Sequence, residues 1–168
     1  MGRKRPPRIR GFDYLGLHAY FLTICTQDRY RAFEDRVHAE CVCTQILQSA
    51  GDYRFEIIAY VVMPDHAHAL AEGTRDDANF VGFVSMLKQR SAYDYSRVCP
   101  RRLWQEGFFD HVLREEESKI GIASYIIHNP VRAGLCTSVL DYPFVGSQRY
   151  TIRELIDAVQ IRPRRSRP

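Results

Sequence analysis

A predicted β-hairpin lies in the middle of the sequence. The run from Tyr53 to Met63 is rich in β-branched and aromatic residues, Pro64 and Asp65 favour a turn, and residues 66–71 can form the partner strand. The hairpin places an antiparallel pair at the centre of the chain. The elements on either side of it therefore decide the fold class.

Strand-type and helix-type segments alternate around this hairpin. Two further β-rich runs, at 18–26 and 108–114, predict strands. Helices are predicted by apolar periodicity or by end signals at 36–50, 80–95, 115–130 and 151–160. The third of these opens on three glutamates, which suit the positive end of a helix dipole, and Pro130 is expected to end it. This order predicts a ferredoxin-like α+β fold, an antiparallel sheet with helices on one face and the other face free for a ligand.

Length and charge predict one domain with basic ends. The 168 residues are 45% hydrophobic and 26% charged, which suits a single core. Residues 1–10 hold five Lys or Arg and no acid, and residues 161–168 hold four Arg and no acid. We therefore expect a basic arm at 1–10, one domain over 11–160 and a basic tail at 161–168. Both ends could bind phosphates, or could serve only as solvated, solubilising segments.

Several protein classes are disfavoured by the composition. The sequence contains no apolar run long enough to span a membrane, and the first residues lack the apolar segment of a secretory signal. The five cysteines are odd in number and scattered, unlike a disulfide framework or a cysteine zinc site. We expect a cytoplasmic protein that does not contact membranes.

Two short motifs carry side chains that could perform chemistry. His66 and His68 are two residues apart in a predicted strand, so both face one side, where they could bind a divalent cation. Taken alone, an accidental pair of surface histidines explains them equally well. Tyr125 and Asn129 are four residues apart on a predicted helix and share a face. On that segment alone, a packing tyrosine and a helix-capping asparagine are the better explanation.

The combination of motifs changes this weighting. The segments MPDHAHAL (63–70), LWQEGFFDHVLREEE (103–117) and YIIHNPVRAGL (125–135), in this order and spacing, resemble the REP-associated tyrosine transposases, a branch of the single-tyrosine HUH nucleases. The segments YFLTICTQDR (20–29) and DYPFVGS (141–147) extend the resemblance over most of residues 18–147. It implies that residues 11–160 form one HUH transposase-like catalytic domain.

The resemblance also implies site residues. The family's histidine metal motif falls on His66 and His68, its nucleophile on Tyr125, and the amide that completes its metal site on Asn129. Asp65 stands where the family usually has asparagine, which places a different charge beside the metal. The implied cofactor is Mg²⁺ or Mn²⁺, acting as a Lewis acid.

The implied function is that of a tyrosine transposase, a metal-dependent single-strand DNA endonuclease and strand transferase. It would cleave at hairpin-forming repeats through a 5′-phosphotyrosine intermediate, with single-stranded or hairpin DNA as partner. The alternatives are a noncatalytic single-stranded nucleic-acid-binding module on the same fold and a hydrolase that uses metal-bound water. We expect a monomer, because the helix and the asparagine that follows it can complete the site within one chain; a dimer is the alternative.

Basic and aromatic residues supply candidate DNA contacts. The basic candidates, which could equally face solvent, are Arg3, Lys4, Arg5, Lys88, Arg90, Arg114, Arg132, Arg164 and Arg165. Trp104, Phe108 and Phe109 could stack on unpaired bases, but core packing explains such aromatics more often. Glu72, His111 and His128 could support a metal site, although packing or solvent exposure is the simpler explanation for them.

Overall fold

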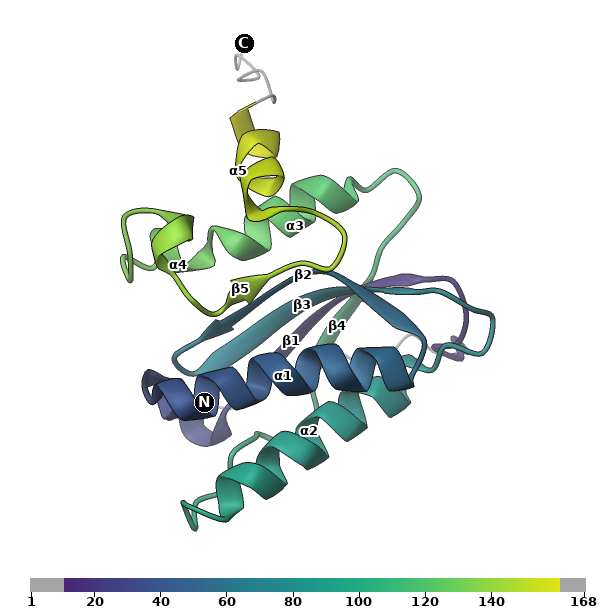
Figure 1. Ribbon diagram of the computed structural model, residues 1–168. Coiled ribbons are helices and arrows are strands. Elements are labelled where there is room, and N and C mark those ends of the chain that lie inside the picture. Colours follow the sequence, from purple (N-terminus) through teal and green to yellow (C-terminus); the bar gives the residue numbers. More distant parts are fainter. Residues whose placement is uncertain (1–10, 161–168) are drawn as a thin grey trace.

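The computed structural model describes residues 11–160, in which five strands form one antiparallel sheet (Figure 1). The strands are β1 (Ala19–Cys25), β2 (Phe55–Met63), β3 (His66–Gly73), β4 (Phe109–Val112) and β5 (Val145–Gly146), in the spatial order β4-β1-β3-β2-β5. β2 and β3 form the predicted hairpin, and β3 also pairs with β1, so the histidine strand is at the centre of the sheet. The ferredoxin-like antiparallel α+β fold is confirmed.

One face of the sheet is covered by α1 (Arg36–Asp52) and α2 (Phe80–Ser96), as predicted (Figure 1). Both helices begin at capping side chains: Asp35 accepts a hydrogen bond from the backbone N–H of Val37, and Asn79 accepts one from Gly82. The larger apolar core lies between these helices and the sheet, and it contains alternate residues of β3 such as Ala67 and Ala69.

The second face of the sheet is not free, which corrects the expectation that helices occupy one face only. α3 (Lys119–Ile127) packs on it, and α5 (Ile152–Gln160) packs on α3 (Figure 1). A second apolar core joins Ala123, Ile126 and Ile127 of α3 to Leu70 of β3. The physical reason is that the strands have apolar side chains on both faces, and the second face needs cover as much as the first.

Two predicted helix boundaries are also corrected. The glutamates at 115–117 lie in a turn, and α3 begins after Ser118, whose hydroxyl accepts a hydrogen bond from Gly121. Pro130 does not end a long helix; it occupies the first turn of the short helix α4 (Asn129–Arg132), where its missing N–H costs nothing. The last helix occurs as predicted, with Thr151 as its cap.

The basic arm and the basic tail, residues 1–10 and 161–168, lie outside the described residues and remain predictions. Within 11–160, no helix combines the length and the apolar character that crossing a membrane requires.

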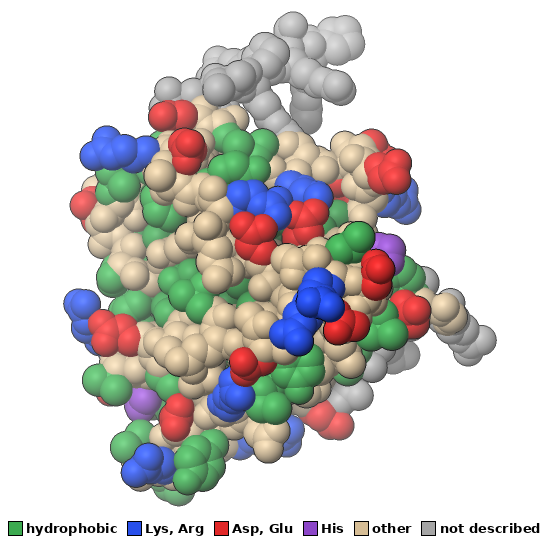
Figure 2. Space-filling model, turned by 45° about the vertical axis from the view of Figure 1, so that its right-hand side comes forward, with side chains coloured by type: hydrophobic (Ala, Val, Ile, Leu, Met, Phe, Trp, Pro, Cys, Tyr) green, Lys and Arg blue, Asp and Glu red, His purple; other side chains and the backbone are tan. Residues whose placement is uncertain are grey.

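Basic and acidic side chains are interspersed on one face of the domain. Figure 2 shows basic side chains beside acidic ones, with no continuous basic patch on the face in view. Arg149 shows how this arises, because it pairs with both Glu56 and Glu72. Phosphate binding on such a surface has to come from particular arginines and not from a broad positive field.

Candidate active site

The two histidines project from β3 toward α3. They alternate along the strand with Ala67 and Ala69, which lie in the core beneath α1 and α2, so the expected common face is confirmed. Their ring centroids are 4.7 Å apart. The ring of His68 also lies 5.3 Å from that of Phe21, which packs against the second core.

Each histidine is held through its Nδ1 atom. Asp65 Oδ1 lies 2.6 Å from Nδ1 of His66, and Thr23 Oγ1 lies 2.8 Å from Nδ1 of His68. A carboxylate can only accept, so His66 carries its proton on Nδ1 and keeps a lone pair on Nε2. These contacts orient both rings and do not involve their Nε2 atoms.

Burial keeps both imidazoles neutral at physiological pH. It lowers the pKa of His66, against the opposing effect of Asp65. Burial, and then the neighbouring His66, lower the pKa of His68 to about 3, with smaller contributions from the positive charges of Arg29 and Arg132. Neutral imidazoles are the form that binds metal ions.

Asn129 lies one helical turn after Tyr125. Tyr125, near the end of α3, is 52% exposed, and the guanidinium carbon of Arg132 lies 3.8 Å from its ring centroid. The amide nitrogen of Asn129 donates to the carbonyl oxygens of Tyr125 and Ile126, at 3.3 and 3.1 Å. The C-cap of α3 is His128 and not Asn129, which begins α4 and bonds to the last carbonyls of α3 through its side chain. Because its NH₂ group makes these bonds, its carbonyl oxygen remains available as a ligand.

Arg132 lies beside Tyr125. Its guanidinium stacks on the ring of Tyr125, and its positive charge makes the smallest contribution to the lowered pKa of His68, which is due mainly to burial and to His66. The second core holds α3 and the histidine strand together, since α3 packs directly on β2 and β3. The structure thus brings Tyr125 and Arg132 to the sheet face that carries the histidines.

The residues present fit a divalent cation. Two neutral imidazole nitrogens and one amide oxygen make a donor set that leaves coordination positions for a substrate. Among residues 11–160, no group of three His, Cys, Asp or Glu side chains could hold a metal ion. A metal centre at the histidine pair would therefore need a ligand of another kind, and Asn129 is the predicted one.

Two of the remaining basic candidates have partners on the other side of the sheet. Lys88 donates to the carbonyl oxygens of Gln105 and Gly107, at 2.7 and 2.5 Å, so it has a structural role. Arg90 pairs with Asp52 at 2.7 Å, and both Lys88 and Arg90 belong to α2, on the opposite side of the sheet. Arg114 is exposed in the turn before α3. Arg3, Lys4, Arg5, Arg164 and Arg165 lie outside the described residues.

The other candidates have structural contacts. Trp104 is 3% exposed and donates to Ser91, so it belongs to the core. His111 pairs with Glu117, and His128 bonds to the carbonyl oxygen of Ser124.

Glu72 is also committed elsewhere. It pairs with Lys119 and Arg149. Burial raises the pKa of Glu72, but hydrogen bonds from Lys119 and Arg149 outweigh it, and the pKa lies below 4.5. Glu72 ties α3 and the segment before α5 to the sheet and does not support a metal site.

Two supporting residues were missed by the sequence reasoning. Thr23 contacts His68 only because β1 pairs with β3 in a register that opposes these two residues. Arg29 reaches Asp65 through its Nε atom, at 2.8 Å, and lies 3.5 Å from Nδ1 of His66. No motif signals either contact, because both depend on how the strands are paired.

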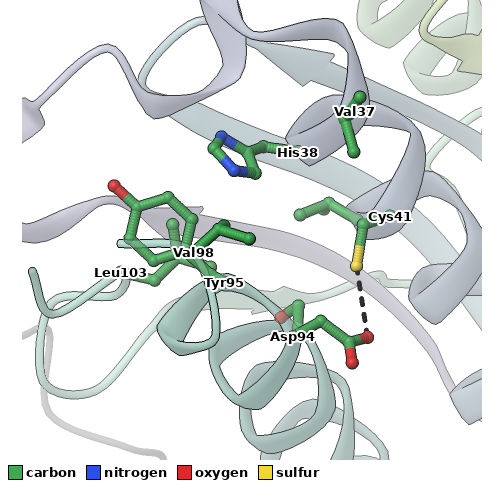
Figure 3. A pocket seen from close by; sticks show the side chains of 9 residues that line it. Val37, His38, Cys41, Asp94, Tyr95, Val98 and Leu103 are labelled. Carbon is green, nitrogen blue, oxygen red and sulfur yellow. Dashed lines mark hydrogen bonds between the residues drawn. The ribbon is translucent and has the colours of Figure 1, made fainter. Parts of the chain in front are cut away.

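A separate pocket lies between α1 and α2 (Figure 3). It holds about 100 Å³, and the rings of His38 and Tyr95 lie near each other on its wall. The thiol of Cys41 donates to Asp94, and burial raises its pKa to about 11, so it is neither a thiolate nor a metal ligand at neutral pH. None of the predicted site residues lines this pocket.

Comparisons with known proteins agree with the fold and the motifs. The profile of the family described as "Transposase IS200 like" matches residues 15–129, a range that includes all four candidate residues. A putative REP-associated tyrosine transposase from Haemophilus influenzae is 28% identical over 151 residues, covering 83% of this chain and 84% of the relative. A REP-associated tyrosine transposase from Escherichia coli K12 is 30% identical over 111 residues, covering 66% of this chain and 65% of the relative.

A solved structure also has the same fold. It is a REP-associated tyrosine transposase bound to a REP hairpin, with a TM-score of 0.65 and 24% identity, covering 83% of this chain and 82% of that one.

Proposed function

The chain belongs to the family of IS200-like transposases, and from this premise we propose that it cleaves and rejoins single-stranded DNA through a covalent bond to Tyr125. The observation that carries the proposal is the position of Tyr125, whose exposed ring stacks on Arg132 and whose helix α3 packs on the strand that carries His66 and His68. This arrangement joins an exposed phenol, a guanidinium and two neutral imidazoles at one surface. A noncatalytic binding module has no need of such a combination.

We also propose that His66, His68 and Asn129 hold Mg²⁺ or Mn²⁺. When bound, the ion would supply Lewis acidity that offsets the charge of a DNA phosphate. The chain's own contribution is to orient the donors: Asp65 and Thr23 hold the imidazoles, and the end of α3 holds the amide. Support from neighbouring groups of this kind strengthens metal binding.

Tyr125 is the proposed nucleophile. Its hydroxyl oxygen forms a bond to phosphorus, the bond from phosphorus to the 3′ oxygen breaks, and the leaving oxygen takes a proton to become a free 3′-hydroxyl. The 5′-phosphotyrosine keeps the energy of the phosphodiester, so a second strand end can be joined without ATP. A phenol is a weak nucleophile, and Arg132 compensates by holding the ring and placing positive charge beside it.

The proposed substrate is DNA that forms a hairpin. REP-associated relatives and the structure of a relative bound to a REP hairpin support this choice. Because α3, which carries Tyr125, packs on β2 and β3 of the same chain, we propose that the protein acts as a monomer.

The test is covalent capture. Wild-type protein incubated with hairpin DNA and Mn²⁺ should form a covalent protein–DNA adduct that survives boiling in detergent. Mass spectrometry should find the added mass of the DNA on the peptide that contains Tyr125. Tyr125→Phe removes one oxygen and should keep DNA binding while losing cleavage and adduct. Tyr93→Phe, at an exposed tyrosine of α2, should react normally. Cleavage by Tyr125→Phe without any adduct would instead indicate a hydrolase, and binding without cleavage by the wild type would indicate a binding module.

The metal proposal has its own measurement. His66→Ala and His68→Ala should each weaken Mn²⁺ binding in calorimetry, and Asn129→Ala should weaken it less, because an amide is a poorer ligand than an imidazole. Unchanged Mn²⁺ affinity in the two histidine variants would place the metal elsewhere.

A further inference from the structure

A tight turn after β1 places an exposed tyrosine at the His66 end of the sheet. Asp28 and Arg29 in this turn have positive φ angles of 55° and 57°, a conformation that costs non-glycine residues energy. The turn is held by Thr26, whose hydroxyl lies 2.7 Å from the carbonyl oxygen of Tyr30 and 2.9 Å from that of Asp65. Tyr30 therefore emerges beside the residue that precedes His66.

An arginine from a distant segment covers the ring of Tyr30. The guanidinium carbon of Arg101 lies 4.3 Å from the ring centroid. The segment that carries Arg101 is fixed to the end of β1, because the backbone N–H of Gln27 donates to Leu103 at 2.8 Å and that of Gln105 donates to Cys25 at 2.9 Å. Buried Trp104 anchors the same segment in the core. Two rigid pieces of backbone thus present the pair of Tyr30 and Arg101, which we call the ledge.

The ledge remains open to solvent. Tyr30 is 45% exposed despite its contact with Arg101, and Arg101 and its neighbour Arg102 are exposed. Arg29, in the same turn as Tyr30, already reaches toward His66. The ledge therefore joins a flat aromatic group to several arginines at the His66 end of the sheet and near Tyr95 of α2, so a DNA strand held at the histidine pair would reach it around the end of β1.

We propose that the ledge is a stacking site for an unpaired nucleobase of the DNA strand bound at the histidine pair, an inference that rests on the proposed function. A tyrosine ring and a guanidinium plane both stack on bases, and the guanidinium also attracts the adjacent phosphate. Because every base has an aromatic face, this contact tolerates any sequence. The ledge positions the single strand that flanks the cleaved phosphate, and sequence recognition belongs to other contacts.

The experiment compares two ligands of equal charge. The first is an oligothymidylate of roughly 20 nucleotides, and the second has the same backbone with abasic sugars, which keeps the phosphates and removes the stacking. Affinities are measured by fluorescence anisotropy in the Tyr125→Phe background, so that no DNA is cleaved. Tyr30→Ala should weaken binding of the oligothymidylate about 5- to 100-fold and leave binding of the abasic strand nearly unchanged.

Two variants serve as matched controls. Tyr30→Phe keeps the ring and should bind like its parent. Tyr93→Ala removes a tyrosine that is 66% exposed but lies on α2, and it should also bind like its parent. The proposal would be overturned if the parent bound the two ligands with equal affinity. It would also be overturned if Tyr30→Ala lost affinity for both ligands by the same factor.

The result is separable from the chemistry proposed for Tyr125. With Tyr125 restored, Tyr30→Ala should still form the covalent adduct at saturating DNA, with a raised DNA concentration for half-maximal rate. Absence of an adduct in the wild type would contradict the nucleophile but would leave the binding comparison valid. A normal adduct together with no base dependence at Tyr30 would contradict the ledge alone.

Discussion

Replacing Arg132 with alanine is expected to slow DNA cleavage more than it weakens DNA binding. The guanidinium stacks on the ring of Tyr125, 3.8 Å away, and we expect it also to contact the phosphate that Tyr125 is proposed to attack. The first contact restricts the ring to one orientation. The second becomes stronger as negative charge develops on the phosphate oxygens, so it acts mainly in the transition state.

The magnitude follows from the exposure of these groups. Tyr125 and Arg132 are both exposed, so the lower end of each range applies. The cation–π contact then contributes about 0.5 kcal/mol. A charge-assisted hydrogen bond to phosphate contributes about 1.5 kcal/mol. The sum of about 2 kcal/mol corresponds to a loss of roughly 30-fold in rate, of which the ring contact alone explains about twofold.

The assay is the single-turnover rate of adduct formation at saturating hairpin DNA. Arg132→Lys keeps the charge but lacks the planar guanidinium, so its rate should lie between those of the wild type and Arg132→Ala. Arg90→Ala is the matched control, because it removes the same charge from α2, across the sheet. A rate within twofold of wild type for Arg132→Ala would refute the reasoning. An equal loss of rate in Arg90→Ala would show that the effect of Arg132→Ala comes from net charge and not from the position of Arg132.

Three further predictions concern the two ends of the chain, Lys88 of α2 and Glu72 of β3. Deleting residues 1–10 and 161–168 removes nine Lys or Arg and should flatten the slope of log DNA affinity against log salt; an unchanged slope would contradict phosphate contacts there. Lys88→Met should lower the free energy of unfolding by about 2–4 kcal/mol in urea titrations, because two bonds from a charged donor are lost; a cost below about 1 kcal/mol would contradict this. The lowered pKa of Glu72 means that its ion pairs stabilise the fold above pH 4.5, and that this stabilisation is lost as pH falls through the lower folded-state pKa. Glu72→Gln should therefore be less stable than the wild type at neutral pH and should lose less stability on acidification. Parallel curves of stability against pH for the two proteins would contradict this prediction.

Local patterns in the sequence predicted β1 to β4 and the longer helices, but not β5, α4 or the second layer of helices. The hairpin and the common face of His66 and His68 follow from the two-residue period of a strand, so they could be predicted directly. The covered second face has a signal in β2, whose residues 57–63 are almost all apolar, as is typical of a strand buried on both sides. A register shift between Ile57 and Ala59 also places Ile58 and Ala59 in the same core, and no local pattern predicts such a bulge.

The support for the histidines could not be predicted because it depends on tertiary register. Thr23 and Arg29 belong to β1 and to the turn after it, more than 35 residues before the histidines in the chain. Their roles arise when β1 pairs with β3 and places Thr23 opposite His68. The resemblance to known transposases supplied the predicted reacting residues, but the groups that hold them had to come from the structure.

Asp65 is the residue at which the chain departs from the family pattern described above. Its Oδ1 atom lies 2.6 Å from Nδ1 of His66, and its Oδ2 atom lies 2.8 Å from Nε of Arg29. The guanidinium therefore balances the carboxylate, so the aspartate adds little net charge to the proposed metal site. Its effect on a metal should come from orienting the imidazole and fixing the proton on Nδ1.

This reasoning separates two substitutions of the same residue. Asp65→Ala removes the acceptor and should weaken Mn²⁺ binding about 10- to 100-fold in calorimetry, the usual cost of losing a group that holds a metal-bound histidine. Asp65→Asn keeps an oxygen that can accept from Nδ1 and loses only the charge, so its Mn²⁺ affinity should fall less than about 10-fold. If the charge of Asp65 governed the site instead, the two variants would lose affinity equally. Equal losses would thus contradict the orienting role and show that Arg29 does not neutralise the carboxylate.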